Sequence, residues 1–151
     1  MRNCVFSVKG QLGRFFKSAG SYAEATERAM EVLATFNLDQ WALEAAEGLS
    51  EGDKKILDTA MAFALDSKFL LLDEPTSGVA TAEKFKVMDT IIKAIGERGT
   101  ATMIIEHDMD IVAEYTQRVM VLSEGTILAD GDPASVMEDK LVKETLFGVS
   151  D

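Results

Sequence analysis

The sequence predicts a mixed α/β protein with a helical first part, then a parallel β-α-β unit, a β-hairpin and a terminal helix. Two observations carry this prediction. Apolar residues recur at helical spacing as far as Leu65, and two strand-like segments, 69–72 and 101–106, then flank one further helical pattern. Consecutive strands joined by a helix form a right-handed parallel crossover, so these segments should pair. At 151 residues the chain has the length of one domain.

Three helical segments are predicted after an irregular entry segment, 1–20. Ser21 begins a capping box, and apolar residues then recur at helical spacing up to Phe36. A second piece, 40–47, should end at Gly48, and Ser50 should cap a third helix. The stripe predicted to be buried on this third helix consists of Ile56, Leu57, Ala60, Met61, Ala64 and Leu65.

The β-α-β unit follows from a change of pattern near residue 68. The run 69–72 is wholly apolar and too short for a helix, which is typical of a strand buried on both faces. Thr81 can cap the next helix, which Gly96 or Gly99 can end. The predicted buried residues of this helix are Phe85, Met88, Ile92 and Ile95.

The C-terminal part is predicted to hold a short helix, 110–115, and a hairpin. The hairpin strands are 118–122 and 126–129, joined by a turn at Glu124 and Gly125. Asp132 and Pro133 then begin a terminal helical segment.

Composition excludes several classes of function. Acidic residues exceed basic ones by 11, so the chain as a whole repels phosphate backbones, and non-specific nucleic-acid binding is not expected. A single cysteine, Cys4, cannot form an internal disulfide, which fits a reducing compartment. No stretch approaches the roughly 20 apolar residues that span a bilayer. We therefore expect a cytoplasmic chain whose membrane association is peripheral.

Two acidic residues end the first predicted strand. An apolar strand followed by Asp73 and Glu74 is the Walker B pattern, in which one carboxylate holds Mg²⁺ and the next orients an attacking water. The alternative is a strand that simply ends in solvated acids.

Two further positions could contact phosphate. Ser50, Gly52 and the amides of a helix N-terminus can bind an anion, although Ser50 and Asp53 could equally serve only as a helix cap. His107 is the single histidine and follows the second strand, where it could donate a hydrogen bond to a phosphate or be purely structural.

Taken together, these motifs resemble a known family. Residues 49–53 (Leu-Ser-Glu-Gly-Asp), 69–78 (Phe-Leu-Leu-Leu-Asp-Glu-Pro-Thr-Ser-Gly) and 105–108 (Ile-Glu-His-Asp) resemble, in order and spacing, the ATP-binding cassette ATPases of ABC transporters. Segments 106–110, 119–122, 125–133 and 146–148 look most like the branched-chain amino-acid and urea importers. The resemblance implies part of a P-loop NTPase fold, with the helical signature subdomain in 1–66 and the Walker B and switch-histidine portion in 67–151.

The resemblance also implies a role for each matching residue. Asp73 would bind Mg²⁺ through water, Glu74 would be the general base, and His107 would contact the γ-phosphate of ATP. Ser50 and Gly52 would close on ATP held by a second ATPase subunit. Ser77 and Gly78 would lie in the loop between the two sites of the dimer. Transmembrane permease subunits would be the further partners, on the cytoplasmic face of the membrane.

The sequence departs from the family at several points. Glu51 and Asp53 stand where the commonest signature has Gly and Gln, and Ala80 where many relatives have an acid. No G-x-x-x-x-G-K-[ST] phosphate loop occurs; the segment 10–18 is similar, but Phe16 replaces the required glycine. We therefore expect the chain to be a C-terminal portion that cannot hydrolyse ATP alone.

Two alternatives remain open from sequence. The chain is a fragment of an importer ATPase, or a truncated non-hydrolysing dimerisation or regulatory module. An ABC ATPase of translation or DNA repair is disfavoured by the acidic balance. Removing the flanking strands of such a domain should uncover an apolar sheet face, so a homodimer or higher oligomer is expected.

Overall fold

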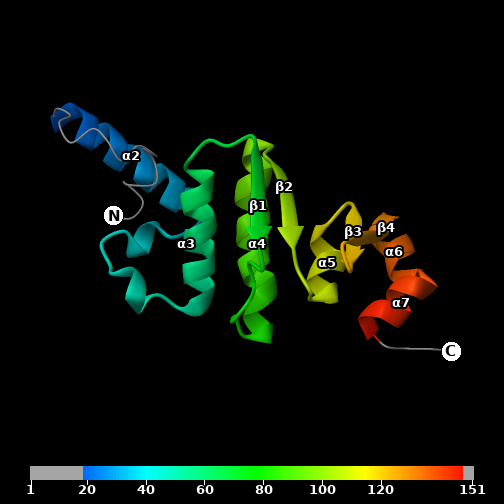
Figure 1. Ribbon diagram of the computed structural model, residues 1–151. Helices are drawn as coiled ribbons and strands as arrows, with labels where there is room; N and C mark the ends of the chain where they lie inside the picture. Colours follow the sequence, from blue (N-terminus) through cyan, green and yellow to red (C-terminus); the bar gives the residue numbers. More distant parts are fainter. Residues whose placement is uncertain (1–18, 148–151) are drawn as a thin grey trace. The chain divides into compact units, whose positions relative to one another are not determined.

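The structure of the protein, a computed structural model, describes residues 19–147. It contains two compact units, Met1–Ile105 and Glu106–Asp151, which are described separately (Figure 1). Cys4 and the glycine-containing segment 10–18 lie outside the described residues. The predicted portions, a helical one over 1–66 and a catalytic one over 67–151, were defined by their functional motifs. This division stays a prediction.

The first unit begins with one long helix and two short 3₁₀ turns. Helix α2 spans Ala19–Thr35, so Ser21 lies inside the helix and the predicted capping position is wrong. The helix predicted over 40–47 is also wrong. Two 3₁₀ helices, η1 (Asp39–Trp41) and η2 (Ala46–Gly48), occupy this stretch, because Ala45 between them has an extended backbone with ψ 135°.

Helix α3 spans Glu51–Phe63 and contributes to the largest apolar core. Ile56, Ala60 and Ala64 are buried as predicted, but Leu65 is 52% exposed. The helix has ended by then, and the chain turns through a left-handed residue, Asp66, with φ 55°. The sequence pattern also missed Phe63, whose ring packs edge-on against that of Phe36 with centroids 5.2 Å apart.

One arginine holds the end of α3 to the end of α4 (Thr81–Arg98). The Arg98 guanidinium lies 3.6 Å from the centre of the Phe63 ring and donates a 2.8 Å hydrogen bond to the carbonyl of Phe63. It also pairs with Asp66 at 3.0 Å, and Arg28 of α2 donates to the same carboxylate. Three helices therefore meet at one cluster.

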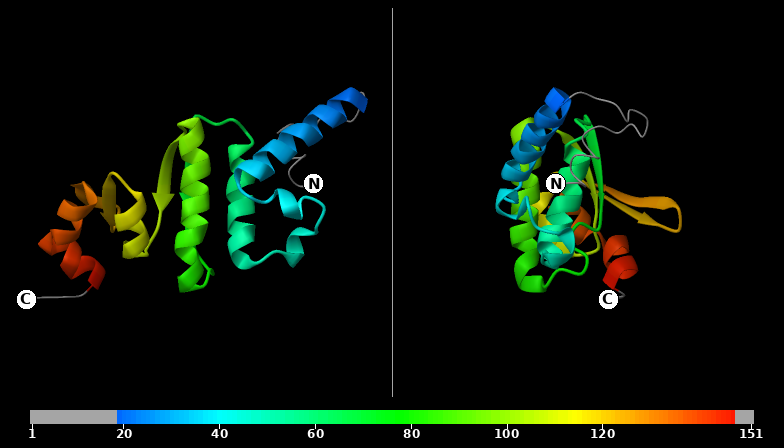
Figure 2. Two further views of the ribbon diagram at one scale, coloured as in Figure 1. Left: turned by 180° about the vertical axis from the view of Figure 1, so that it is seen from behind. Right: turned by 90° about the vertical axis from the view of Figure 1, so that its left-hand side faces the viewer.

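The predicted parallel pair of strands is confirmed. Strand β1 (Phe69–Asp73) pairs in parallel with β2 (Ala101–Ile105), with Phe69 opposite Ala101 and Asp73 opposite Ile105. Helix α4 connects them and runs along one face of the sheet (Figures 1 and 2). The carboxyl ends of both strands therefore meet at one edge, where Asp73 lies.

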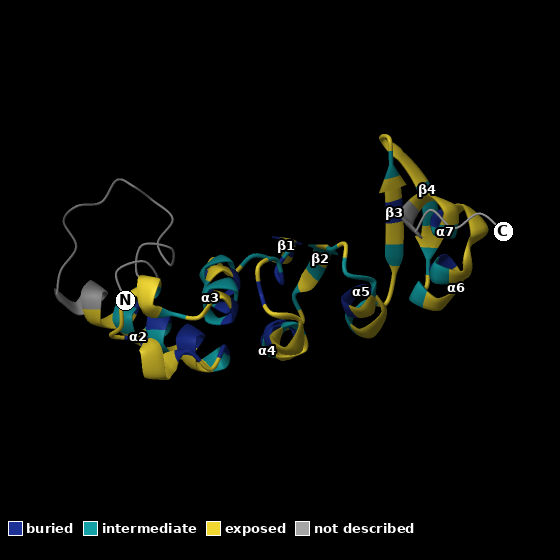
Figure 3. Ribbon diagram, turned by 90° about the horizontal axis from the view of Figure 1, so that it is seen from below, coloured by how far each residue is buried: buried dark blue, intermediate teal, exposed yellow. Residues whose placement is uncertain are grey.

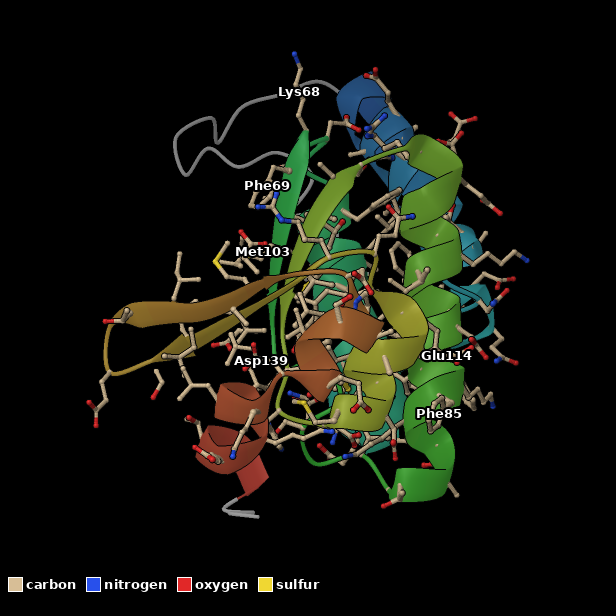
Figure 4. All side chains as sticks on the ribbon, turned by 90° about the vertical axis from the view of Figure 1, so that its right-hand side faces the viewer. Lys68, Phe69, Phe85, Met103, Glu114 and Asp139 are labelled. Carbon is tan, nitrogen blue, oxygen red and sulfur yellow. The ribbon has the colours of Figure 1, made fainter. Side chains whose placement is uncertain are left out.

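The expectation that β1 is buried on both faces is wrong. Leu70 and Leu72 are buried in the core, whereas Phe69 and Leu71 are 53% and 57% exposed. On β2, Met103 is exposed on the same face as Phe69, and Figure 4 shows both side chains pointing away from α4. Within the described residues, α3 and α4 cover only one side of the sheet.

Helix α4 differs from its predicted pattern at both ends. Ala80 occupies the N-cap and makes no side-chain cap, so Thr81 is the first helical residue rather than the cap. Gly99 ends the helix with φ 67°, a left-handed conformation that glycine adopts without strain. Met88 and Ile95 are buried as predicted, but Phe85 is 41% exposed. Ile92 is half-buried, and the buried stripe also includes Val87, Ile91 and Ala94.

The second unit contains the predicted hairpin. Helix α5 (Met109–Tyr115) precedes the antiparallel strands β3 (Val119–Ser123) and β4 (Thr126–Gly131). Glu124 and Gly125 form the turn with positive φ angles of 49° and 75°, and Figure 3 shows this turn as exposed.

The terminal segment forms two helices instead of one. Asp132 accepts a 3.0 Å hydrogen bond from the Ser135 amide at the start of α6 (Pro133–Glu138), as its capping pattern predicts. Asp139 then accepts from the amides of Leu141 and Val142, which begins α7 (Lys140–Phe147). A second capping residue therefore divides the segment.

Candidate functional site

The predicted acidic pair lies at the carboxyl end of β1. Asp73 is the last strand residue and is exposed, and Glu74 is half-buried. The amide of Glu74 donates a 2.9 Å hydrogen bond to the carbonyl of Ile105, which extends the β1–β2 ladder by one bond. Adjacent strand residues point to opposite faces, but Glu74 leaves the strand geometry with φ 46°. Its side-chain direction is therefore set by the turn, not by the pleat.

A left-handed non-glycine residue costs about 1–2 kcal/mol and persists only where its surroundings hold it. Here the Ser77 amide donates a 3.1 Å hydrogen bond to the carbonyl of Glu74, and the Val79 amide donates to that of Thr76. Val79 is buried in the core, which anchors the far end of the loop. The loop after β1 is thus fixed at both ends.

Ser77 and Gly78 lie on this fixed loop. Gly78 is exposed with φ 78°, and a side chain there would meet open space, so its backbone conformation is what requires glycine. Ser77 is half-buried. Asp73, Glu74, Ser77 and Gly78 are therefore brought together on one short segment, as their sequence positions predict.

The capping role predicted for Ser50 is confirmed. Its hydroxyl accepts a 3.1 Å hydrogen bond from the Asp53 amide and donates one of 2.8 Å to the Asp53 carboxylate. By helix geometry, the amides of Glu51 and Gly52 have no partner within α3, and they carry the positive end of its dipole. The helix cap at Ser50 is therefore shown, and the binding of an anion at this helix end stays a prediction.

Gly52 has a packing role that sequence reasoning missed. It is buried, and a Cβ added there would lie 3.0 Å from Cγ2 of Val87 on α4. Since Val87 is itself buried, a side chain at position 52 would force Val87 to shift by a few tenths of an ångström at the present spacing of α3 and α4. Glycine in the first turn of a helix is a signal for close approach, but the partner helix could not be identified from the sequence.

The negative charge of Glu51, the acidic residue next to Ser50, is paired with a lysine of the same helix. Glu51 accepts a 2.8 Å hydrogen bond from Lys54, and this bond and the lysine charge lower the pKa of the Glu51 carboxyl. Glu51 is exposed. Helix α3 therefore begins with an acid whose charge is paired within the same helix.

His107 belongs to the second unit. It is exposed just after the end of β2, and its amide donates a 3.3 Å hydrogen bond to the Glu106 carboxylate. It precedes Asp108, the N-cap of α5. Its predicted joint action with Asp73 and Glu74 stays a prediction.

The carboxylate at the end of β1 suits a magnesium ion whose other ligands are waters and substrate phosphates. Within the described part of the chain, no three His, Cys, Asp or Glu side chains gather to hold a metal ion by themselves. Magnesium typically uses one or two carboxylates together with waters and substrate phosphates. An exposed carboxylate at a strand end, such as that of Asp73, fits this mode.

A family model described as "ABC transporter" matches residues 3–77. The "Probable branched-chain amino acid transport ATP-binding protein LivG" of Archaeoglobus fulgidus is 28% identical over 156 residues, which cover 100% of this chain and 60% of LivG. The cobalt import ATP-binding protein CbiO of Salmonella typhimurium is 36% identical over 114 residues, covering 76% of this chain and 42% of CbiO. The chain belongs to the ABC transporter ATPase family.

Solved structures agree on the ABC ATPase fold. The cbiO1 protein of Clostridium perfringens, part of the ABC transporter complex cbiONQ, has a TM-score of 0.74 and 26% identity. The match covers 94% of this chain and 56% of cbiO1. The predicted α/β class, as part of a P-loop NTPase domain, is confirmed. No helix within residues 19–147 is long and apolar enough to cross a membrane.

Proposed function

We propose that this ABC ATPase chain supplies the hydrolytic carboxylates of the ATP-binding and ATP-hydrolysing subunit of an ABC importer. The observation that carries the proposal is the end of β1. There Asp73 and Glu74 project from a parallel sheet edge, and main-chain hydrogen bonds fix the loop that follows them. In open parallel sheets, ligands bind at the carboxyl ends of the strands.

Each residue has a distinct proposed role. Asp73 holds the water shell of Mg²⁺, Glu74 takes a proton from the attacking water, and His107 donates a hydrogen bond to the γ-phosphate. Magnesium neutralises the charge that develops on the transferred phosphoryl group. Ser50 and Gly52, at the start of α3, close on ATP held by a second subunit.

The proposed partners are a second ATPase subunit and transmembrane permease subunits, with the chain on the cytoplasmic face of the membrane. Ser77 and Gly78 form the contact loop between the two ATPase subunits. The proposed cargo is a branched-chain amino acid, because LivG matches along the whole chain. The likeness to CbiO, a cobalt import protein, makes metal import the competing cargo class.

We expect the 151-residue chain not to hydrolyse ATP by itself. It has no G-x-x-x-x-G-K-[ST] loop to cradle the β- and γ-phosphates, and its excess of acidic residues repels nucleotide. Steady-state Mg²⁺-dependent hydrolysis by the pure chain, abolished by Glu74→Gln, would contradict this expectation.

The test uses a LivG hybrid in which residues 1–151 replace the segment of LivG that aligns with this chain. With Glu74→Gln to trap the closed dimer, ATP-dependent dimerisation is measured by sedimentation. Ser50→Ala removes a hydrogen bond to a charged acceptor and should weaken closure about tenfold or more. Gly52→Asp should be worse, because it adds a charge beside the phosphate.

A control separates charge from packing at Gly52. Any side chain there meets Val87, so Gly52→Asp is also made with Val87→Ala, which opens space on α4. A loss of closure that persists in this background is due to the charge. If both Ser50→Ala and Gly52→Asp leave dimerisation unchanged, Ser50 is only a cap and the non-hydrolysing module is the better interpretation.

A further inference from the structure

A lysine on α3 reaches the acidic end of β1. Lys55 is half-buried, and its Nζ donates a 3.2 Å hydrogen bond to the main-chain carbonyl of Glu74. The neighbouring Lys54 instead pairs with Glu51 on its own helix at 2.8 Å. Two adjacent lysines thus have different environments, and only Lys55 contacts the loop that carries the proposed general base.

The contact falls on the peptide group that decides where Glu74 points. The amide of Glu74 is bonded to Ile105, and its carbonyl accepts from both the Ser77 amide and Lys55. With φ at 46°, the residue has left the strand, so its Cα–Cβ direction depends on how its two peptide groups are held. Lys55 adds a charged side-chain donor, at 3.2 Å, to the two main-chain hydrogen bonds that hold these peptide groups.

We propose that Lys55 is a positioning residue for Glu74: it holds the left-handed turn that aims the carboxylate at the attacking water. This inference rests on the proposed ATPase function. Lys55 acts through the Glu74 carbonyl, which accepts its hydrogen bond.

The same bond joins two parts of the proposed machinery. Helix α3 begins at the Ser50 cap and carries Lys55 in its second turn, so a shift of the helix moves the anchor of Glu74.

The first experiment needs no activity. In the 151-residue chain, amide hydrogen exchange is measured at Glu74 and Ser77 in the parent, Lys55→Met and Lys54→Met proteins. We expect Lys55→Met to speed exchange of the Ser77 amide about tenfold, since its acceptor peptide loses a charged bond. Lys54→Met, the matched control, should leave both amides within about twofold of the parent. Equal exchange in all three proteins would overturn the proposal.

The second experiment uses the LivG hybrid with Glu74 intact. Lys55→Met should lower kcat about tenfold at saturating ATP while KM stays within about twofold, because misplacing a catalytic group affects chemistry more than binding. Lys55→Arg, which keeps a charged donor, should recover most of kcat, and Lys54→Met should retain it. A rise in KM with unchanged kcat, or no recovery by arginine, would overturn the positioning role.

The two experiments separate this inference from the proposed function. A parent hybrid without ATPase activity would contradict the proposed function, and hydrogen exchange would still decide whether Lys55 holds the Glu74 turn. An active hybrid in which Lys55→Met changes neither kcat nor exchange would contradict the Lys55 inference alone.

Discussion

The two faces of β1 have similar side chains and opposite environments. Leu70 and Leu72 point into the core formed with α3 and α4, at 4% and 7% exposure. Phe69 and Leu71 point the other way and are more than half exposed. Strands that are apolar on both faces are typical of parallel sheets covered on both sides. The difference shows that the described residues supply one of the two layers that this strand is built to contact.

The largest expected effect tests this comparison directly. Leu72→Ala removes buried methyl groups and should lower the free energy of unfolding by about 2–5 kcal/mol. Leu71→Ala, one residue away on the exposed face, should change it by less than about 0.5 kcal/mol. Urea unfolding of both variants of the 151-residue chain measures the difference. Equal losses would show that the second face is also covered.

A smaller loss of stability is expected when a side chain is added to Gly52, which is buried against α4. Gly52→Ala should lower the free energy of unfolding by about 1–3 kcal/mol, because the new methyl group meets Val87 at 3.0 Å. Val87→Ala should remove most of that penalty when the two are combined. A double variant in which the two losses simply add would rule out this contact as the cause.

The exposed face should make the isolated chain self-associate. Apolar patches on sheet faces are usually covered by another chain, so light scattering should show dimers or larger species at high concentration. Leu71→Asp combined with Met103→Asp should weaken association at least about tenfold without unfolding the chain. A parent chain that stays monomeric at high concentration contradicts the expectation.

The smallest effect concerns the Asp132 carboxylate, which caps helix α6. The hydrogen bond from Ser135 holds the pKa of Asp132 below its ordinary value of 3.8. A lowered pKa in the folded state stabilises the fold above the ordinary value, and that contribution is lost as the pH falls below 3.8. Circular dichroism should show α6 weakening in this range. Asp132→Asn keeps a capping side chain that does not titrate, so it should remove this part of the pH dependence.

Much of the framework could be predicted from local patterns. The hairpin turn and the caps at Ser50 and Asp132 depend on residues close in sequence, and all are confirmed. The pairing of β1 with β2 joins residues as far apart as Phe69 and Ala101, and it is confirmed because the strand–helix–strand order predicts a parallel crossover. The candidate acids also lie where the pattern puts them, because strand ends are local features.

What failed depends on packing between distant elements. Which face of β1 is covered, the contact of Gly52 with Val87, and the reach of Lys55 to Glu74 all involve separate elements. Spacing along one helix does not indicate which neighbour lies opposite. The missed helix over 40–47 has a different cause, since extended backbone at Ala45 splits a pattern that periodicity alone made continuous.

The Ser50 hydroxyl has a single proton, and the Asp53 carboxylate already accepts it. The Asp53 carboxylate therefore accepts the hydrogen bond that a phosphate oxygen would otherwise accept from Ser50. A nucleotide that binds here must displace an acceptor held only three residues away. In the proposed contact of Ser50 with ATP, two anions therefore compete for one hydrogen, and the identity of residue 53 determines how strongly the chain competes.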